Sequence, residues 1–305
     1  MEHVRTGIEL AGMKLKNPLL LASGTAGYGT ELASIIDLSS LGGIILKSVT
    51  LEARGGNPEP RIWETCGGML NSIGLENVGM DSLAEEVLPS LGGLNTEIIV
   101  SIAGDTVRSY ARMAARLTEV PQVSAFELNV SCPNVERGGI LFGVDSGATA
   151  AVMMAVRENT DRPIFAKLSA AVTDISRVAE AAIAAGASGL SLINTIPGLA
   201  IDPVSRRPRL GAVTGGLSGP AIKPVALKAI WDCYRSTRAQ IIGGGGVYDA
   251  RDVVEFLLAG ATAVAVGTAM FKDPQRPLKI LEGLPAALSD AGAASPAELV
   301  GALRV

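Results

Sequence analysis

The chain has 305 residues and a mass of 31.2 kDa, with 48% hydrophobic and 18% charged residues. This composition is typical of a globular protein with a large core and excludes an intrinsically disordered chain. The net charge is -4 and no run of Lys and Arg exceeds two residues, which argues against nucleic acid or an anionic membrane as a partner.

Targeting signals and cysteines point to a cytoplasmic protein. The N-terminal residues contain no apolar segment typical of a secretory signal, and Gly, Asn and Pro interrupt the uncharged stretch 181–201, so we expect no membrane span. The three cysteines, Cys66, Cys132 and Cys233, are widely spaced and indicate reduced thiols. They are too few for a four-cysteine iron–sulfur cluster within this chain.

Eight apolar segments with the composition of β-strands follow a short hairpin at Ile8–Leu15. Several are apolar throughout, as expected for parallel strands that are covered on both faces. The segments are Leu19–Ala22, Gly43–Leu46, Ile98–Ile102, Ala125–Val130, Pro163–Leu168, Gly189–Ile193, Gln240–Ile242 and Ala263–Val266.

Helical patterns follow most of these strands. Asp174–Ala185 places apolar residues at helical spacing and ends before Gly186. Asp105–Leu117 begins on an acidic cap and Ser146–Arg157 on a serine. The remaining predicted helices are Ser218–Tyr234, Asp249–Leu258 and Pro277–Leu288.

This order of elements predicts an α/β fold, a (β/α)8 TIM barrel that forms one domain over residues 1–305. A doubly wound sheet is the competing arrangement, but the chain lacks the glycine-rich dinucleotide turn after the first strand. Ser48–Met80, Ser131–Asp145 and Asn194–Leu217 are much longer than the ~2–6-residue loops common in such folds. In a barrel they all extend from the carboxyl-end face, where active sites lie.

Two glycine-rich turns follow the last two strands. They are I-I-G-G-G-G-V (Ile241–Val247) and A-V-G-T-A-M (Ala265–Met270). Glycine lets backbone N–H groups approach an anion, and Asp249 begins a helix whose N-terminus favours negative charge. One such turn would be explained by tight geometry alone. Two at the usual phosphate position of this fold favour a phosphate-bearing cofactor.

Two lysines stand at strand ends, Lys47 and Lys167. Each would ordinarily extend to solvent or pair with a carboxylate. Next to a phosphate site, they are instead suited to stabilise negative charge on a reduced flavin.

Four asparagines are predicted on the same face: Asn71, Asn129, Asn134 and Asn194. A single asparagine is more often a turn residue or a cap. Together, their donors and acceptors suit a planar ring that alternates C=O and N–H groups.

Cys132 lies directly after a strand, in N-V-S-C-P-N-V. A thiol has a reference pKa of about 8.5, which suits a general base near neutral pH. The single histidine, His3, is at the terminus and does not compete for this role. Cys66 and Cys233 are interpreted as buried structural thiols.

Four segments carry a resemblance to a known family: Lys47–Arg61, Asn71–Leu75, Asn129–Val135 and Thr214–Pro224. Along nearly its whole length the chain resembles class 1 dihydroorotate dehydrogenases, and most closely the catalytic subunit of subclass B. That subunit works with a partner that carries FAD and a two-iron cluster and passes electrons to NAD.

The resemblance implies FMN-dependent oxidation of (S)-dihydroorotate to orotate in de novo pyrimidine (UMP) biosynthesis. Cys132 would remove the C5 proton while hydride leaves C6 for FMN N5. It implies no metal on this chain and a homodimer within a heterotetramer. The implied substrate residues are Lys47, Asn71, Ser72, Ile73, Gly74, Leu75, Asn129, Asn134, Asn194 and Thr195. The implied FMN residues are Ser23, Lys47, Ser48, Ser101, Asn129, Lys167, Ile193, Gly219, Gly245, Gly246, Gly267 and Thr268.

Some positions depart from the family pattern. Ser101 replaces a usual asparagine, so that flavin contact is expected to be shorter or mediated by water. Ala170 and Ala171 replace a common Pro-Asn, and Cys66 stands where proline is frequent. Alternative hypotheses are a related FMN barrel that acts on another dihydropyrimidine or uses fumarate as acceptor, and a non-catalytic phosphate-ligand-binding barrel.

Overall fold

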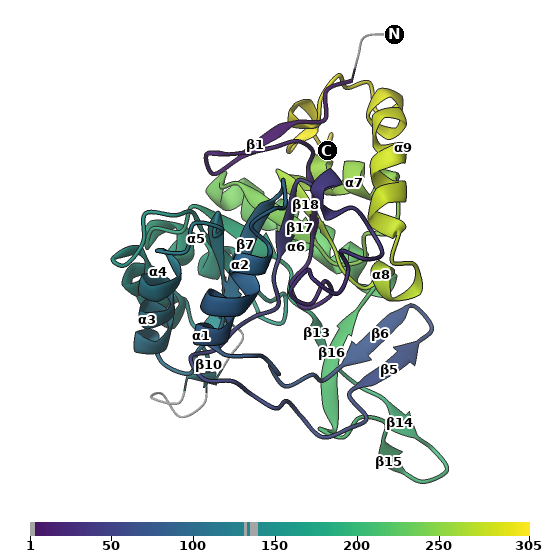
Figure 1. Cartoon of the computed structure of the whole chain (residues 1–305). Coiled ribbons are helices and arrows are strands. Elements are labelled where there is room, and N and C mark those ends of the chain that lie inside the picture. Colours follow the sequence, from purple (N-terminus) through teal and green to yellow (C-terminus); the bar gives the residue numbers. More distant parts are fainter. Residues whose placement is uncertain (1–3, 131–132, 135–139) are drawn as a thin grey trace.

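The fold is a closed barrel of eight parallel strands (Figure 1). The computed structural model describes residues 4–130, 133–134 and 140–305. Every pair of neighbouring barrel strands is parallel. The predicted (β/α)8 barrel is therefore confirmed. Its strands, in order around the barrel, are β3 (Leu19–Leu21), β4 (Gly43–Ile45), β7 (Glu97–Ile102), β8 (Ala125–Asn129), β11 (Ile164–Leu168), β12 (Gly189–Leu192), β17 (Ile241–Gly244) and β18 (Ala263–Val266).

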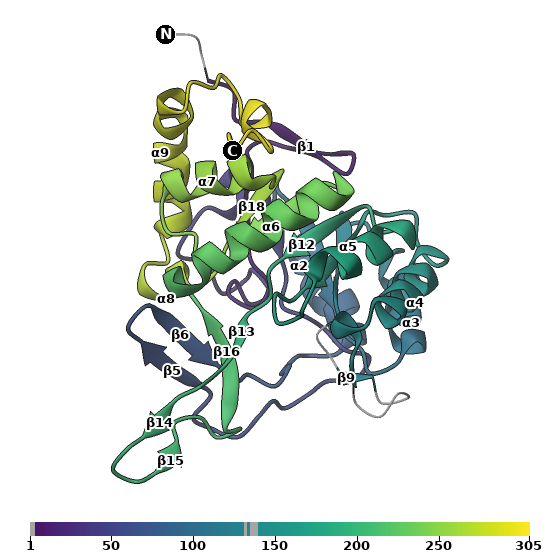
Figure 2. The same cartoon turned by 180° about the vertical axis from the view of Figure 1, so that it is seen from behind.

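Helices surround the barrel, as the two opposite views show (Figure 2). The longer ones are α3 (Val107–Leu117), α4 (Ser146–Arg157), α5 (Ile175–Ala184), α6 (Lys223–Thr237), α7 (Ala250–Ala259) and α9 (Arg276–Asp290). Short helical segments are α1 (Met80–Ser82), the π-turn η2 (Leu83–Val87), α2 (Leu88–Ser90) and α8 (Ala269–Lys272). The 3-10 turns are η1 (Leu38–Ser40), η4 (Phe142–Val144), η5 (Pro220–Ile222) and η6 (Pro296–Leu299).

Side-chain caps fix where several helices begin, and two predicted caps are wrong. The predicted acidic cap, Asp105, instead pairs with Arg54 at 2.6 Å, and the Thr106 hydroxyl caps α3. The predicted serine cap of α4 is also displaced, because the carboxylate of Asp145 accepts the N–H of Ala148. Thr and Asp both cap helices well, so a residue next to the predicted one can accept the free N–H groups of the first turn instead.

The helix predicted from Ser218 begins later than expected. A strand, β16 (Thr214–Ser218), occupies its first position, and α6 begins only at Lys223. Between them Gly219 has a φ of 100°, a conformation that a helix does not accommodate. The following Pro220 then starts η5.

The interior of the barrel is apolar at its amino end. Inward-facing residues such as Leu20, Ile45, Phe165 and Ile242 form one buried cluster. The predicted hairpin, β1 (Ile8–Leu10) and β2 (Met13–Leu15), contributes Leu10 to the same cluster and so covers this end. The amino end is therefore sealed, and ligands can reach the interior only from the carboxyl end.

A second sheet lies across the carboxyl end, and the sequence had not predicted it. It joins β5 (Ile62–Thr65) and β6 (Gly68–Asn71), from the excursion after β4, to β13 (Ile196–Leu199) and β16, from the excursion after β12. In Figure 1 this sheet lies at one end of the barrel, and β1 lies at the other end. Two small ribbons complete the strands: β9 (Pro133–Asn134) with β10 (Ile140–Leu141), and β14 (Ile201–Asp202) with β15 (Arg207–Pro208).

No helix within the described ranges combines the length and the apolar character that crossing a bilayer requires.

Gly189 is required by the packing inside the barrel. A Cβ at this position would lie 2.8 Å from the Phe165 ring and 2.6 Å from the carbonyl oxygen of Gln240. We expect Gly189→Ala to destabilise the fold by about 1–3 kcal/mol, because the buried ring and the backbone must both move. Urea unfolding measures this, with Gly93→Ala as the control because a Cβ there meets nothing within 4 Å. Equal unfolding midpoints for the two variants would contradict the prediction.

Candidate active site

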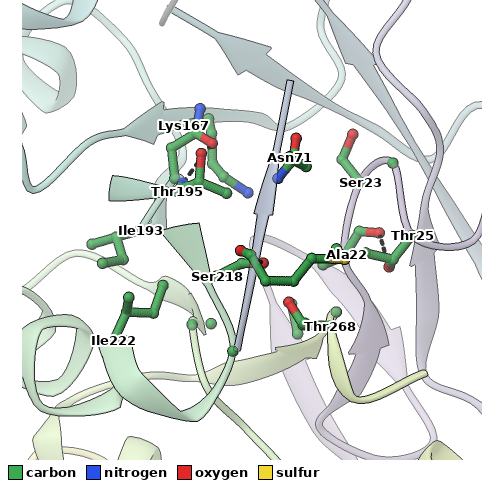
Figure 3. A pocket seen from close by; sticks show the side chains of 18 of the residues that line it. Ala22, Ser23, Thr25, Asn71, Lys167, Ile193, Thr195, Ser218, Ile222 and Thr268 are labelled. Carbon is green, nitrogen blue, oxygen red and sulfur yellow. Dashed lines mark hydrogen bonds between the residues drawn. The ribbon is translucent and has the colours of Figure 1, made fainter. Parts of the chain in front are cut away.

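A cavity of about 420 Å³ opens at the carboxyl ends of the barrel strands, beneath the four-stranded sheet. Figure 3 shows Lys167, Thr195, Asn71 and Ser23 on one side of it and Ile222 and Thr268 on the other. The cavity gathers most of the residues predicted from the sequence. They are Ser23, Lys47, Ser48, Asn71, Ile73, Gly74, Leu75, Asn129, Lys167, Ile193, Asn194, Thr195, Gly219, Gly245, Gly246, Gly267 and Thr268.

Two of the predicted residues that the structure describes, Ser101 and Ser72, do not line it. Ser101 is fully buried and its hydroxyl lies 2.8 Å from that of Ser48, so it supports a lining residue. The Ser72 hydroxyl accepts a hydrogen bond from Asn57 Nδ2 at 2.8 Å. Cys132 lies outside the described residues, and Asn134 is described only as part of β9. The roles predicted for Cys132 and Asn134 stay predictions.

A chain of polar contacts crosses the cavity floor. Ser23 donates its hydroxyl to the carbonyl of Leu46 at 2.9 Å. Asn129 Nδ2 donates to Ser48 Oγ at 3.3 Å, and Asn194 Nδ2 donates to Asn129 Oδ1 at 3.4 Å. Because each amide is oriented by a neighbour, the floor presents donors and acceptors in fixed directions.

Sequence reasoning missed Glu127, which stands on β8 and lines the cavity. Its side chain is only 1% exposed, and its carboxylate accepts hydrogen bonds from Ser191 Oγ at 2.6 Å and Lys167 Nζ at 3.2 Å. A carboxylate between the apolar Phe126 and Leu128 was the signal that could have revealed it, because a buried charge requires a partner.

The two predicted lysines lie in different environments. Lys167 pairs with a carboxylate, which was the ordinary alternative for both. Lys47 is half-buried in the cavity wall, and its ammonium makes no hydrogen bond or ion pair with any residue that the structure describes. A desolvated ammonium favours a nearby anion, so Lys47 is the stronger candidate to bind a negatively charged ligand group.

Four backbone amides form a cradle at the ends of β17 and β18. The N–H groups of Gly245, Gly246, Gly267 and Thr268 donate no hydrogen bond within the described parts of the chain, and all four residues line the cavity. Gly246 is required here, because its φ is 95° and a Cβ would lie 3.0 Å from the carbonyl oxygen of Gly219. Free backbone amides can bind an anion, so the phosphate site predicted from the glycine turns stays a prediction that these residues fit.

The N-terminus of α7, which was predicted to favour a bound anion, already has its N–H groups bonded to side chains of this chain. Asp249 accepts the N–H groups of Arg251 and Asp252, and the carboxylate of Asp252 accepts those of Tyr248 and Asp249. These acidic side chains already supply the negative charge that the helix N-terminus favours. The two glycine turns therefore remain the candidate anion site.

The excursion after β4 brings residues 71–75 over the cavity. Asn71 ends β6 and donates its Nδ2 to the carbonyl of Gly216 at 3.3 Å, which ties it to β16. Asn57 N–H donates to the carbonyl of Ile73, and Arg61 pairs with Glu76 at 3.0 Å. The antiparallel sheet thus holds in place a segment that is distant in sequence from the barrel strands beneath it.

The two cysteines that the structure describes differ in exposure. Cys233 is buried, as predicted, and burial raises the pKa of its thiol to about 12, so this group is inert near neutral pH. The prediction that Cys66 is buried is wrong. It is exposed because it lies in the tight turn between β5 and β6. Within the described residues, no group of three or more His, Cys, Asp or Glu side chains is arranged to hold a metal.

Comparison with known proteins identifies the family of the chain. Residues 6–288 match the family model of dihydroorotate dehydrogenase. The chain belongs to the dihydroorotate dehydrogenase family. The resemblance predicted from its four sequence segments is thereby confirmed.

Relatives within this family match over nearly their whole length. The chain is 51% identical over 299 residues to a protein of Desulforudis audaxviator, covering 98% of this chain and 97% of the relative. It is 50% identical over 305 residues to a protein of Geobacter metallireducens, covering both chains completely. Both are dihydroorotate dehydrogenase B (NAD(+)), catalytic subunits.

Proposed function

We propose that this protein oxidises (S)-dihydroorotate to orotate in de novo pyrimidine biosynthesis, using FMN bound in a single barrel domain of residues 1–305. Family membership supports the reaction. The observation that carries the proposal is the pairing, in one cavity, of an anion cradle with the unpaired ammonium of Lys47. One suits a cofactor phosphate and the other a substrate carboxylate.

The residues present fit FMN. The cavity falls within the ~300–1,000 Å³ range of small-molecule sites. The amides of Gly245, Gly246, Gly267 and Thr268 would hold the phosphate, and Lys167, Ser23 and Ser48 lie along the floor for the ring. When bound, FMN supplies the acceptor for the hydride that leaves C6 of the substrate.

The chain's own residues would bind the substrate and move its proton. Asn71, Asn129, Asn194 and Thr195 line the cavity, and their amide and hydroxyl groups match the alternating C=O and N–H groups of a dihydropyrimidine. Asn134 and the 73–75 segment complete the proposed substrate site. Cys132 would remove the C5 proton, which the neighbouring carbonyl makes acidic.

Electrons are proposed to leave through a second subunit. The relatives are named catalytic subunits linked to NAD(+), which supports a partner for this chain as well. We propose that the partner carries FAD and a two-iron cluster and that two copies of each chain form a heterotetramer around a homodimer. This chain has only three cysteines, which is consistent with a cluster on the other subunit.

The base assignment is tested with Cys132→Ala. We expect the purified protein to retain FMN and the rate of flavin bleaching by dihydroorotate to fall by about 10²–10⁴, the usual contribution of a general base. Cys132→Ser should recover activity only at raised pH, because a hydroxyl is a weaker acid than a thiol. Anaerobic stopped-flow absorbance measures both, with Cys66→Ala as the control. An alanine variant that bleached at the normal rate would refute the assignment.

The substrate carboxylate is tested with Lys47→Met. We expect kcat/KM for dihydroorotate to fall roughly 10- to 100-fold, since a hydrogen bond to a charged group contributes about 1.5–3 kcal/mol. The much weaker turnover of dihydrouracil, which has no carboxylate, should fall far less. Lys228→Met on the surface of α6 is the control. Equal losses for the two substrates, or a wild-type preference for dihydrouracil, would favour the alternative hypothesis of another dihydropyrimidine.

The electron acceptor is tested by comparing the isolated chain with a co-expressed pair. The isolated chain should reduce dyes but not NAD, and the partner should restore NAD reduction. Fumarate serves as the competing acceptor in the same assay. NAD reduction at full rate by the isolated chain, or turnover with fumarate, would contradict a separate electron-transfer subunit.

A further inference from the structure

The function proposed above assigns no role to the buried carboxylate of Glu127. Its contacts in the barrel indicate one. In the barrel, β11 lies between β8 and β12. Ser191 on β12 pairs in register with Lys167 on β11, whereas Glu127 on β8 pairs with Phe165 and reaches Lys167 through its side chain. The 2.6 Å contact from Ser191 Oγ fixes the carboxylate, and the 3.2 Å contact fixes the lysine ammonium on the cavity floor.

Closing the barrel does not require this ion pair. Inward residues closer to the amino end, such as Ile45 and Phe165, are apolar and pack without charges. Replacing a buried ion pair by apolar residues of similar volume is often neutral or stabilising. A charged pair at this position, facing the cavity, is therefore better explained by what it does to a ligand.

The pair also determines the charge of the cavity. Its charged lining residues are Lys47, Glu76, Glu127 and Lys167. Glu76 is paired with Arg61, and Glu127 balances Lys167. One uncompensated ammonium, that of Lys47, then remains among the described lining residues. The two lysines that look alike in sequence thus present different net charges to a ligand.

We propose that Glu127 is a positioning residue, which holds Lys167 against the cofactor ring and offsets its charge, so that Glu127 lowers the reduction potential of the bound flavin. The inference rests on the proposed FMN site. A negative charge beside an ammonium weakens the field that would stabilise an anionic reduced ring. Removing that charge leaves Lys167 uncompensated and favours the reduced cofactor.

The decisive variant is Glu127→Gln, which keeps the shape and a hydrogen-bonding group but removes the charge. We expect the equilibrium ratio of reduced to oxidised flavin, at one fixed solution potential, to rise at least tenfold. This corresponds to a rise of about 30 mV in the reduction potential of a two-electron couple. Glu127→Asp, which keeps the charge, should stay close to the wild type. Glu85→Gln removes an equal charge from a surface pair with Arg116 and is the matched control.

Spectroscopic redox titration of the purified holoenzymes measures the shift, and thermal unfolding of the same samples reports stability. A purely structural role would lower the stability of Glu127→Gln without moving its potential, and would overturn the inference. If Glu127→Gln does not fold, Glu127→Met, which is apolar like the inward residues closer to the amino end, replaces it with the same expected sign. An unchanged potential in that variant would equally overturn the inference.

Failure of the proposed function can be distinguished from failure of this inference alone. A wild-type protein that binds no FMN, or whose FMN dihydroorotate does not reduce, refutes the function and the inference together. A wild type that behaves as proposed, with Glu127→Gln indistinguishable in potential from Glu85→Gln, refutes the inference alone.

Discussion

Barrel closure imposes one constraint on which the site depends. In each strand, side chains alternate between the interior and the helices outside, so only alternate residues reach the barrel mouth. On β11 the interior positions are Phe165 and then Lys167, two residues apart. Along β11 the barrel interior therefore changes from apolar to polar between two successive inward-facing residues.

That change makes the cavity both rigid and chemically selective. The apolar residues seal the amino end, while the cavity floor above them carries an ion pair and oriented amides from adjacent strands. Strands position side chains more accurately than loops do, and the polar groups of the floor hold each other through hydrogen bonds. The anion cradle uses backbone amides, whose direction is fixed by the positive φ of Gly245 and Gly246.

The ends of the cavity are completed by segments that are remote in sequence. Asn71 pairs in register with Gly216, across two excursions that leave the barrel from different strands. This pairing places the predicted substrate segment above the predicted cofactor floor. A change in either excursion would move the roof of the cavity without touching the barrel.

The sequence by itself determined the barrel and most strand positions, because continuous apolar runs, terminal glycines and polar residues at strand ends are local signals. The same signals and the family resemblance together identified only part of the cavity lining. It did not reveal the sheet over the mouth, since short exposed strands such as β5 have no buried face and pair only with distant partners. Nor did it distinguish Lys47 from Lys167. Only the tertiary structure decided that, because whether a carboxylate lies beside a lysine depends on which strands neighbour it in the closed barrel.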